Sequence, residues 1–86
     1  MKIYDFNGNK NICGARVKEA RKRIGLSQEN LAAKLQIEGV NIERDSVSWI
    51  EIGTRFVADY EVIALAKVLN VSLEYLLDSD NKNPKQ

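Results

Sequence analysis

The side chains able to perform catalysis or bind a metal are few in this sequence and poorly spaced for either role. Among its 86 residues there is no histidine and a single cysteine, Cys13, which excludes a zinc site built from His and Cys. The carboxylates follow neither metal-ligand nor acid–base spacing; they include Glu29, Glu38, Glu43 and Glu51. The sequence also lacks a glycine-rich phosphate loop. We therefore expect no metal, no cofactor, no small-molecule substrate and no enzymatic activity, with Cys13 as a small core residue.

Hydrogen-bonding side chains gather instead in residues 44–55, RDSVSWIEIGTR, together with the single tryptophan of the sequence. If this segment is a short helix, Val47 and Ile50 are three positions apart and face inward. The outward positions are then Arg44, Asp45, Ser48, Trp49 and Ile52, with Ser46 at the edge. This face offers donors and acceptors, yet it also exposes two large apolar side chains, which normally avoid water.

Two helices are predicted ahead of this segment. Asn11 is a suitable cap for the first, and Gly25 is suited to ending it; its expected inner residues are Cys13, Val17, Ala20 and Ile24. Ser27 caps the second only two residues later, so the link between them is very short. The expected inner residues of the second helix are Leu31, Ala32 and Leu35.

Residues 36–44, QIEGVNIER, interrupt the helical pattern. Two interpretations fit: an extra helical turn followed by a loop, or a long loop anchored by Ile37, Val40 and Ile42. A third helix follows from about Arg44 to Ile52, and Gly53 ends it.

Two more helices are predicted after the loop at residues 54–58. Asp59 is a good cap for the fourth helix, and Asn70 is a plausible terminator; its expected inner residues are Val62, Ile63, Ala66 and Leu69. Ser72 caps a fifth helix, for which the expected buried residues are Leu73, Leu76 and Leu77.

The sequence thus predicts an all-α, compact five-helix domain over residues 12–77, with a helix-turn-helix formed by the second and third helices. We expect residues 1–11 to form an extended arm carrying Ile3, Tyr4 and Phe6, and residues 78–86, which contain no apolar side chain, to form a disordered tail. A 44% apolar and 29% charged composition is that of a globular domain. The single cysteine, the short apolar runs and the lack of a signal-peptide stretch lead us to expect a cytoplasmic protein with no membrane partner.

Charge is distributed unevenly along the chain, although its net value is only +1. Residues 1–55 hold ten Lys or Arg against seven Asp or Glu, whereas residues 56–86 hold three against five. The first part is mildly basic, which is a weak indication of nucleic-acid binding.

Three stretches in a fixed order carry a resemblance to a known family: RVKEARKRIGLSQENLA, SVSWIEIGTR and IALAKVLNVSLEYLL. Over residues 12–77 the chain resembles the phage-repressor or Cro-like helix-turn-helix family, also called the xenobiotic-response-element family. The resemblance implies a sequence-specific transcriptional regulator that binds double-stranded DNA, and we expect a repressor. It also implies a homodimer on two half-sites, for which helix 5, with Tyr75 and Leu76, is the expected surface.

The site residues follow from helix chemistry together with this resemblance. Gln28 lies in the first turn of a helix, where N–H groups and the helix dipole favour a phosphate. The resemblance implies that Gln28 contacts the DNA backbone and braces the third helix, and that Arg21 forms a structural ion pair with Glu51. We expect the third helix to lie in the major groove.

Individual DNA contacts can be assigned within residues 44–55. Arg44 is able to donate two hydrogen bonds to guanine, and Thr54 with Arg55 suits a phosphate. Outward residues expected to contribute hydrogen bonds or contacts to bases or phosphates are Asp45, Ser46, Ser48 and Trp49.

Trp49 and Ile52 depart from the family, which usually has Lys or Arg at the first position and Arg or Asn at the second. Three placements stay open for them: against DNA, against a protein partner, or buried beneath residues 36–42. The second placement gives an alternative function, a protein-interaction module such as an antitoxin-like or anti-repressor component.

Overall fold

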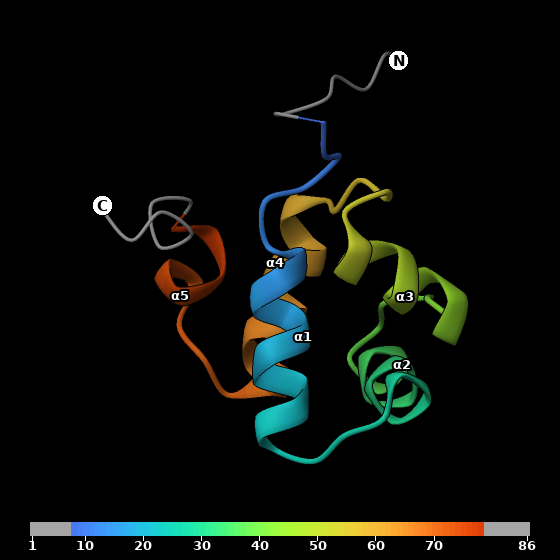
Figure 1. Ribbon diagram of the computed structural model, residues 1–86. Coiled ribbons are helices and arrows are strands. Elements are labelled where there is room, and N and C mark those ends of the chain that lie inside the picture. The colour runs from blue at the N-terminus through green and yellow to red at the C-terminus, as the bar shows by residue number, and fades with distance from the viewer. Residues whose placement is uncertain (1–7, 79–86) are drawn as a thin grey trace.

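The computed structural model describes residues 8–78, and these form five helices, as predicted (Figure 1). The helices are α1 (Gly14–Arg23), α2 (Gln28–Ile37), α3 (Arg44–Ile52), α4 (Asp59–Leu69) and α5 (Leu73–Leu77). In Figure 1, α1 and α4 lie side by side at the centre, with α2 and α3 on one side and α5 on the other. The arm residues Ile3, Tyr4 and Phe6 and the tail residues 79–86 lie outside the described part of the chain.

The helix α1 begins two residues later than the predicted cap Asn11 implies: its N-cap is Cys13, whose side chain makes no capping hydrogen bond, and Asn11 instead bonds to the first helical residue. The Asn11 Oδ1 accepts a hydrogen bond from the Gly14 backbone N–H at 2.8 Å, so this side chain satisfies a donor at the helix start. At the other end Gly25 has φ +78°, in the left-handed region, and its N–H donates to the Lys22 carbonyl. The chain therefore reverses within three residues before Ser27.

The segment between α2 and α3 combines the two predicted interpretations. The Ser27 Oγ caps α2 by accepting from the Asn30 N–H at 2.9 Å, and the helix continues to Ile37. A loop then follows, in which Val40 and Ile42 are buried while Ile37 is 81% exposed. Ile37 is thus no anchor, because it lies on the outer side of the added turn.

The last two helices show one shifted cap. Ala58, not Asp59, precedes α4, and its N–H donates to the Glu61 Oε1 at 3.0 Å. Asn70 ends α4 in the left-handed conformation with φ +59°, as predicted. The Ser72 Oγ caps α5 by accepting from the Tyr75 N–H at 3.0 Å.

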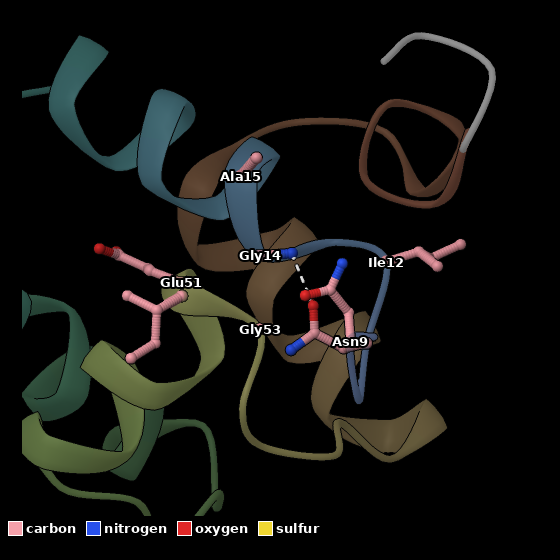
Figure 2. A pocket seen from close by; sticks show the side chains of 8 residues that line it. Asn9, Ile12, Gly14, Ala15, Glu51 and Gly53 are labelled. Atoms are coloured by element: carbon pink, nitrogen blue, oxygen red, sulfur yellow. Dashed lines mark hydrogen bonds between the residues drawn. The ribbon is translucent and has the colours of Figure 1, made fainter. Parts of the chain in front are cut away.

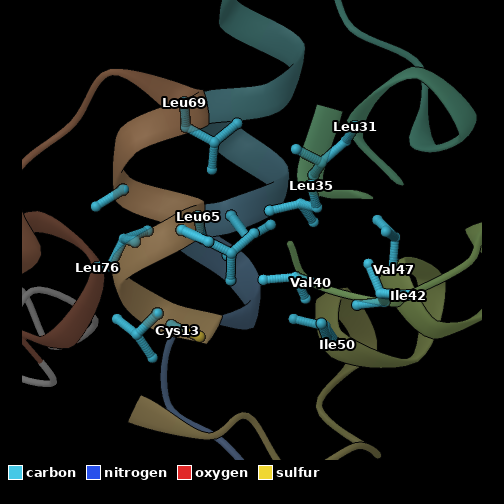
Figure 3. Packing of buried hydrophobic residues seen from close by; sticks show 14 of the residues in the cluster. Cys13, Leu31, Leu35, Val40, Ile42, Val47, Ile50, Leu65, Leu69 and Leu76 are labelled. Carbon is cyan, nitrogen blue, oxygen red and sulfur yellow. The ribbon is translucent and has the colours of Figure 1, made fainter. Parts of the chain in front are cut away.

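The core lies where α1, α2, α3 and α4 meet, and α5 closes it through Leu76 (Figure 3). Most predicted inner residues are buried, and so is Leu65, which was not predicted. Four predicted inner residues are exposed instead. Ile63, Leu73 and Leu77 lie on the solvent-facing sides of their helices, and Ile24 follows the last residue of α1.

Cys13 is part of this core, with 1% of its surface exposed. Burial raises the pKa of its thiol to about 11, so the thiol is protonated and unreactive at neutral pH. No helix within residues 8–78 is long and apolar enough to cross a membrane. That same part of the chain contains no group of three or more His, Cys, Asp or Glu side chains able to hold a metal ion.

Candidate nucleic-acid interface

The two sides of α3 differ completely in exposure. Val47, Ile50 and Glu51 are buried against the rest of the domain. The opposite side faces solvent, with Ser46 and Ser48 partly exposed; its exposed members are Arg44, Asp45, Trp49 and Ile52. The structure therefore brings the predicted outward residues of α3 together on one accessible surface.

A buried ion pair attaches α1 to the inner side of α3. The Arg21 Nε donates to Glu51 Oε2 at 2.6 Å, and the Arg21 Nη2 donates to Oε1 at 3.0 Å. The Arg21 side chain is 9% exposed and that of Glu51 only 1%. Hydrogen bonding to Glu51 raises the pKa of Arg21, so its guanidinium stays charged.

Gln28 joins this pair from the first turn of α2. Its Nε2 donates to Glu51 Oε1 at 3.0 Å, so the Glu51 carboxylate accepts three side-chain hydrogen bonds from two helices. The arrangement fixes the Gln28 side chain and couples the start of α2 to α3. Gln28 itself remains partly exposed beside the outer face.

A further set of hydrogen bonds, which the sequence did not predict, joins the segment before α1 to the C-terminal end of α3; we call it the junction between α1 and α3. The Asn11 Nδ2 donates to the Ile50 carbonyl at 3.1 Å and to the Arg55 carbonyl at 2.8 Å. The third bond of this side chain runs from the Gly14 N–H to the Asn11 Oδ1 and is the dashed line that starts at Gly14 in Figure 2. Gly14 permits the contact, because a Cβ at this position would overlap the Ile50 carbonyl oxygen.

A small hollow of about 240 Å³ lies beside this junction (Figure 2). It is bordered by the start of α1 and the end of α3, including Asn9, Ile12, Ala15 and Gly53. Its lining contains neither a nucleophile nor a metal-ligand set. The hollow therefore belongs to the junction between the two helices.

The N-terminal end of α3 is held much less firmly. Glu43 precedes the helix, but its side chain makes no capping hydrogen bond. The Arg44 Nη2 lies 2.8 Å from Asp45 Oδ1, and both side chains are more than half exposed. Such a surface pair contributes little to stability, so Arg44 is free to exchange its partner.

Beyond α3, Thr54 and Arg55 have different surroundings. Thr54 is exposed, and its N–H donates to the Trp49 carbonyl at 2.9 Å. The Arg55 Nη1 and Nη2 instead contact the Glu61 carboxylate at 2.9 and 3.2 Å. Burial disfavours the charged Glu61, but hydrogen bonds from Arg55 and the Ala58 N–H outweigh it and lower its pKa. The guanidinium of Arg55 thus holds the loop onto α4.

Trp49 and Ile52 form what we call the apolar patch of α3. Trp49 is 50% exposed and Ile52 is 63% exposed. The interpretation that residues 36–42 bury them is therefore wrong: Val40 and Ile42 turn into the core, beside Val47 and Ile50 (Figure 3).

The predicted surface on α5 also needs correction. Leu76 is 1% exposed and belongs to the core, so it is unavailable for a partner. Tyr75 is partly buried, with the Arg16 guanidinium 4.6 Å from its ring centre and that of Arg23 at 5.5 Å. The exposed apolar side chains of α5 are instead Leu73 and Leu77.

Comparisons with known proteins agree with this geometry. The family model described as a helix-turn-helix domain matches residues 13–77. The chain is similar to the restriction-modification controller protein C.AhdI from Aeromonas hydrophila, with 32% identity and a TM-score of 0.66 over 77% of this chain and 92% of that one. It is also similar to a chain of the SinR protein–SinI protein complex, with 27% identity and a TM-score of 0.69 over 86% and 68%. No curated protein matches.

The family model covers all five helices, including α3 and its outer face. The family and the fold are those of DNA-binding transcription regulators rather than of enzymes. The chain belongs to the phage-repressor or Cro-like family of helix-turn-helix regulators.

Proposed function

We propose that this protein is a sequence-specific regulator, acting as a repressor, that binds double-stranded DNA with α3 in the major groove. The observation that carries the proposal is the contrast between the two sides of α3. Its inner side is bound to α1 through the Arg21–Glu51 ion pair, whereas its outer side presents Arg44, Asp45 and Ser48 to solvent. A helix of this size fits the major groove, where such side chains bond to base edges.

Backbone contacts come from both flanks of α3 in this proposal. Gln28 lies in the first turn of α2, where backbone N–H groups favour a phosphate, and its bond to Glu51 orients it. Thr54 supplies a second phosphate contact from the loop after α3. Arg55 supports this contact from its ion pair with Glu61, which sets the path of the loop.

A homodimer completes the proposal. One helix reads too few base pairs for selectivity in a genome, and dimers of this kind bind half-sites about 34 Å apart. We place the dimer surface on α5, at the exposed Leu73 and Leu77.

A salt titration of binding to random-sequence duplex DNA tests the function. The affinity should fall steeply between about 50 and 200 mM salt, because each neutralised phosphate adds roughly 0.9 to the slope. Lys67→Ala is the matched control, since Lys67 pairs with Glu38 in a hollow between the C-terminal ends of α1, α2 and α4, and its slope should equal that of the wild type. Absence of binding at low salt would contradict the proposal and favour a protein-interaction module that uses the apolar patch.

A further inference from the structure

The outer face of α3 is divided into two chemically different halves. Arg44, Asp45 and Ser48 make a polar half, whereas Trp49 and Ile52 make an apolar half. Ile52 follows Ser48 by four positions and Trp49 follows Asp45 by four, so each apolar residue continues a row begun by a polar one. A duplex that contacts the polar half therefore also meets the apolar half.

The two halves would face different base pairs. Arg44 and Ile52 are eight residues apart, which corresponds to about 12 Å along a helix. Successive base pairs are about 3.4 Å apart, so the apolar half lies roughly three base pairs from the pair that Arg44 reads. The chemistry of the apolar half therefore selects bases at its own positions.

Only one group in the major groove suits an apolar side chain. Guanine presents N7 and O6 acceptors, cytosine and adenine present amino donors, and thymine alone presents a methyl group. Ile52 has no polar atom, and the Trp49 indole has a single N–H donor. Covering the hydrogen-bonding edge of guanine or cytosine with these side chains would leave base groups unpaired, which is unfavourable.

A protein partner fits the apolar patch less well than DNA does. A stable protein interface needs about 800 Å² from each partner, whereas this patch consists of two side chains bounded by Asp45, Ser48 and Thr54. Those polar neighbours suit a groove lined with donors, acceptors and phosphates.

We propose that Trp49 and Ile52 are specificity-determining residues that recognise thymine through its 5-methyl group. The inference rests on the proposed function, since it requires α3 to lie in the major groove. It assigns the apolar patch to the selection of A·T pairs on one side of the pair read by Arg44.

The test begins with selection of preferred sites from a randomised duplex by the wild-type protein. Each thymine of the selected site is then replaced by deoxyuridine, which removes only the methyl group. At one or two positions this change should weaken binding about three- to fivefold, the effect of one buried methyl group. Trp49→Ala and Ile52→Ala should each reduce the loss at one of these positions.

Ile63→Ala is the matched control, because Ile63 is an equally exposed isoleucine on α4 and should leave the deoxyuridine effect unchanged. Thermal unfolding of all three variants confirms that each is folded at the assay temperature. Selection of a site that is insensitive to deoxyuridine at every position would overturn the inference while the proposed function stands. Sensitivity that persists in both α3 variants would also overturn it and leave the apolar patch to a protein partner. Failure to select any site would overturn the proposed function together with the inference.

Discussion

The two ends of α3 are built in opposite ways. At the C-terminal end the Glu51 carboxylate accepts bonds from Arg21 and Gln28, and Asn11 binds the Ile50 carbonyl. At the N-terminal end no side chain caps the helix, and the Arg44–Asp45 pair is more than half exposed. One end is fixed to two other helices, whereas the other is held mainly by its inward aliphatic residues.

In this small domain, one end of α3 sets the orientation of the helix and the other end is left to contact a ligand. The fixed end determines the angle at which α3 leaves the domain, because its bonds come from α1, α2 and the segment before α1. The exposed end keeps its charged side chains adaptable, so they are able to change partners without disturbing the core. Substitutions at the two ends should therefore have separable effects on stability and on binding.

The largest effect is expected at the fixed end. Glu51→Ala should lower the free energy of unfolding by roughly 3–5 kcal/mol, because the buried charge of Arg21 would lose its carboxylate and keep only its hydrogen bond to the Leu26 carbonyl. Urea unfolding measures this change, and Asp45→Ala is the matched control at the other end, with an expected change below about 0.5 kcal/mol. Similar losses in the two variants would show that the ends do not differ.

Asn11→Ala should have the next largest effect on stability. It removes three hydrogen bonds, at about 1 kcal/mol each, and leaves the Ile50 carbonyl without this donor, so we expect a loss of about 2–3 kcal/mol. Asn41→Ala, in the exposed loop before α3, is the control and should change the free energy of unfolding by less than about 0.5 kcal/mol. Equal unfolding midpoints for the two variants would remove Asn11 from the fixed end.

At the exposed end the effect should appear in binding instead. Arg44→Ala should weaken binding to the preferred site by about 1–3 kcal/mol and relax selectivity at one base pair, while the urea midpoint stays within error. Titrations against the preferred duplex and its single-base variants measure both quantities. Uniform weakening on every sequence would instead identify Arg44 as a phosphate contact.

The smallest effect on stability is expected in the loop after Gly53, which Arg55 and Glu61 attach to α4. Glu61→Gln should cost about 1 kcal/mol at pH 7, because the charge-assisted bonds from Arg55 are weakened. The pKa of Glu61 is lowered in the folded protein. Its contribution is therefore complete above the unfolded value of about 4.3 and is lost as the pH falls through the folded pKa.

Urea unfolding of this variant and the wild type should accordingly differ at pH 7 and converge on acidification. A difference that persists or grows as the pH falls would mean that the Glu61 charge does not stabilise the loop.

The helix boundaries were largely predictable because they depend on local backbone chemistry. Gly25, Gly53 and Asn70 all have positive φ at helix ends, and Ser27 and Ser72 cap the helices that they precede. Each of these signals acts within three or four residues of its own position. Asp59 was wrong by one residue, because Glu61 reaches back to the Ala58 N–H in its place.

The inner sides of the last helices were less predictable. The sequence EVIALAKVL is apolar at most positions, so its spacing alone does not distinguish the exposed Ile63 from the buried Leu65. In α5 only five residues are helical, and packing against α1 and α4 buries Leu76 while Leu73 and Leu77 stay exposed. Tertiary packing decides these cases.

In the candidate site, too, features that depend on local spacing were predictable, whereas contacts between segments far apart in the sequence were not. The outward face of α3 followed from its period, and the Arg21–Glu51 pair followed from the family resemblance. The Asn11 contacts join residues 39 and 44 positions apart, and no local pattern indicates them. The sequence predicted a phosphate contact for Arg55 and gave no sign of its pairing with Glu61, because that pairing depends on how the intervening loop folds.

The rate at which Cys13 is chemically modified can measure how often the junction between α1 and α3 opens. This thiol, the only one in the sequence, is buried next to Gly14 and protonated at neutral pH, so a thiol-specific reagent modifies it only when the surrounding chain opens. The rate of modification therefore reports the frequency of that opening in the unmodified protein. Modification of Cys13, followed by mass spectrometry with and without DNA, would show whether DNA on the outer face of α3 lowers the frequency of opening at the junction between α1 and α3.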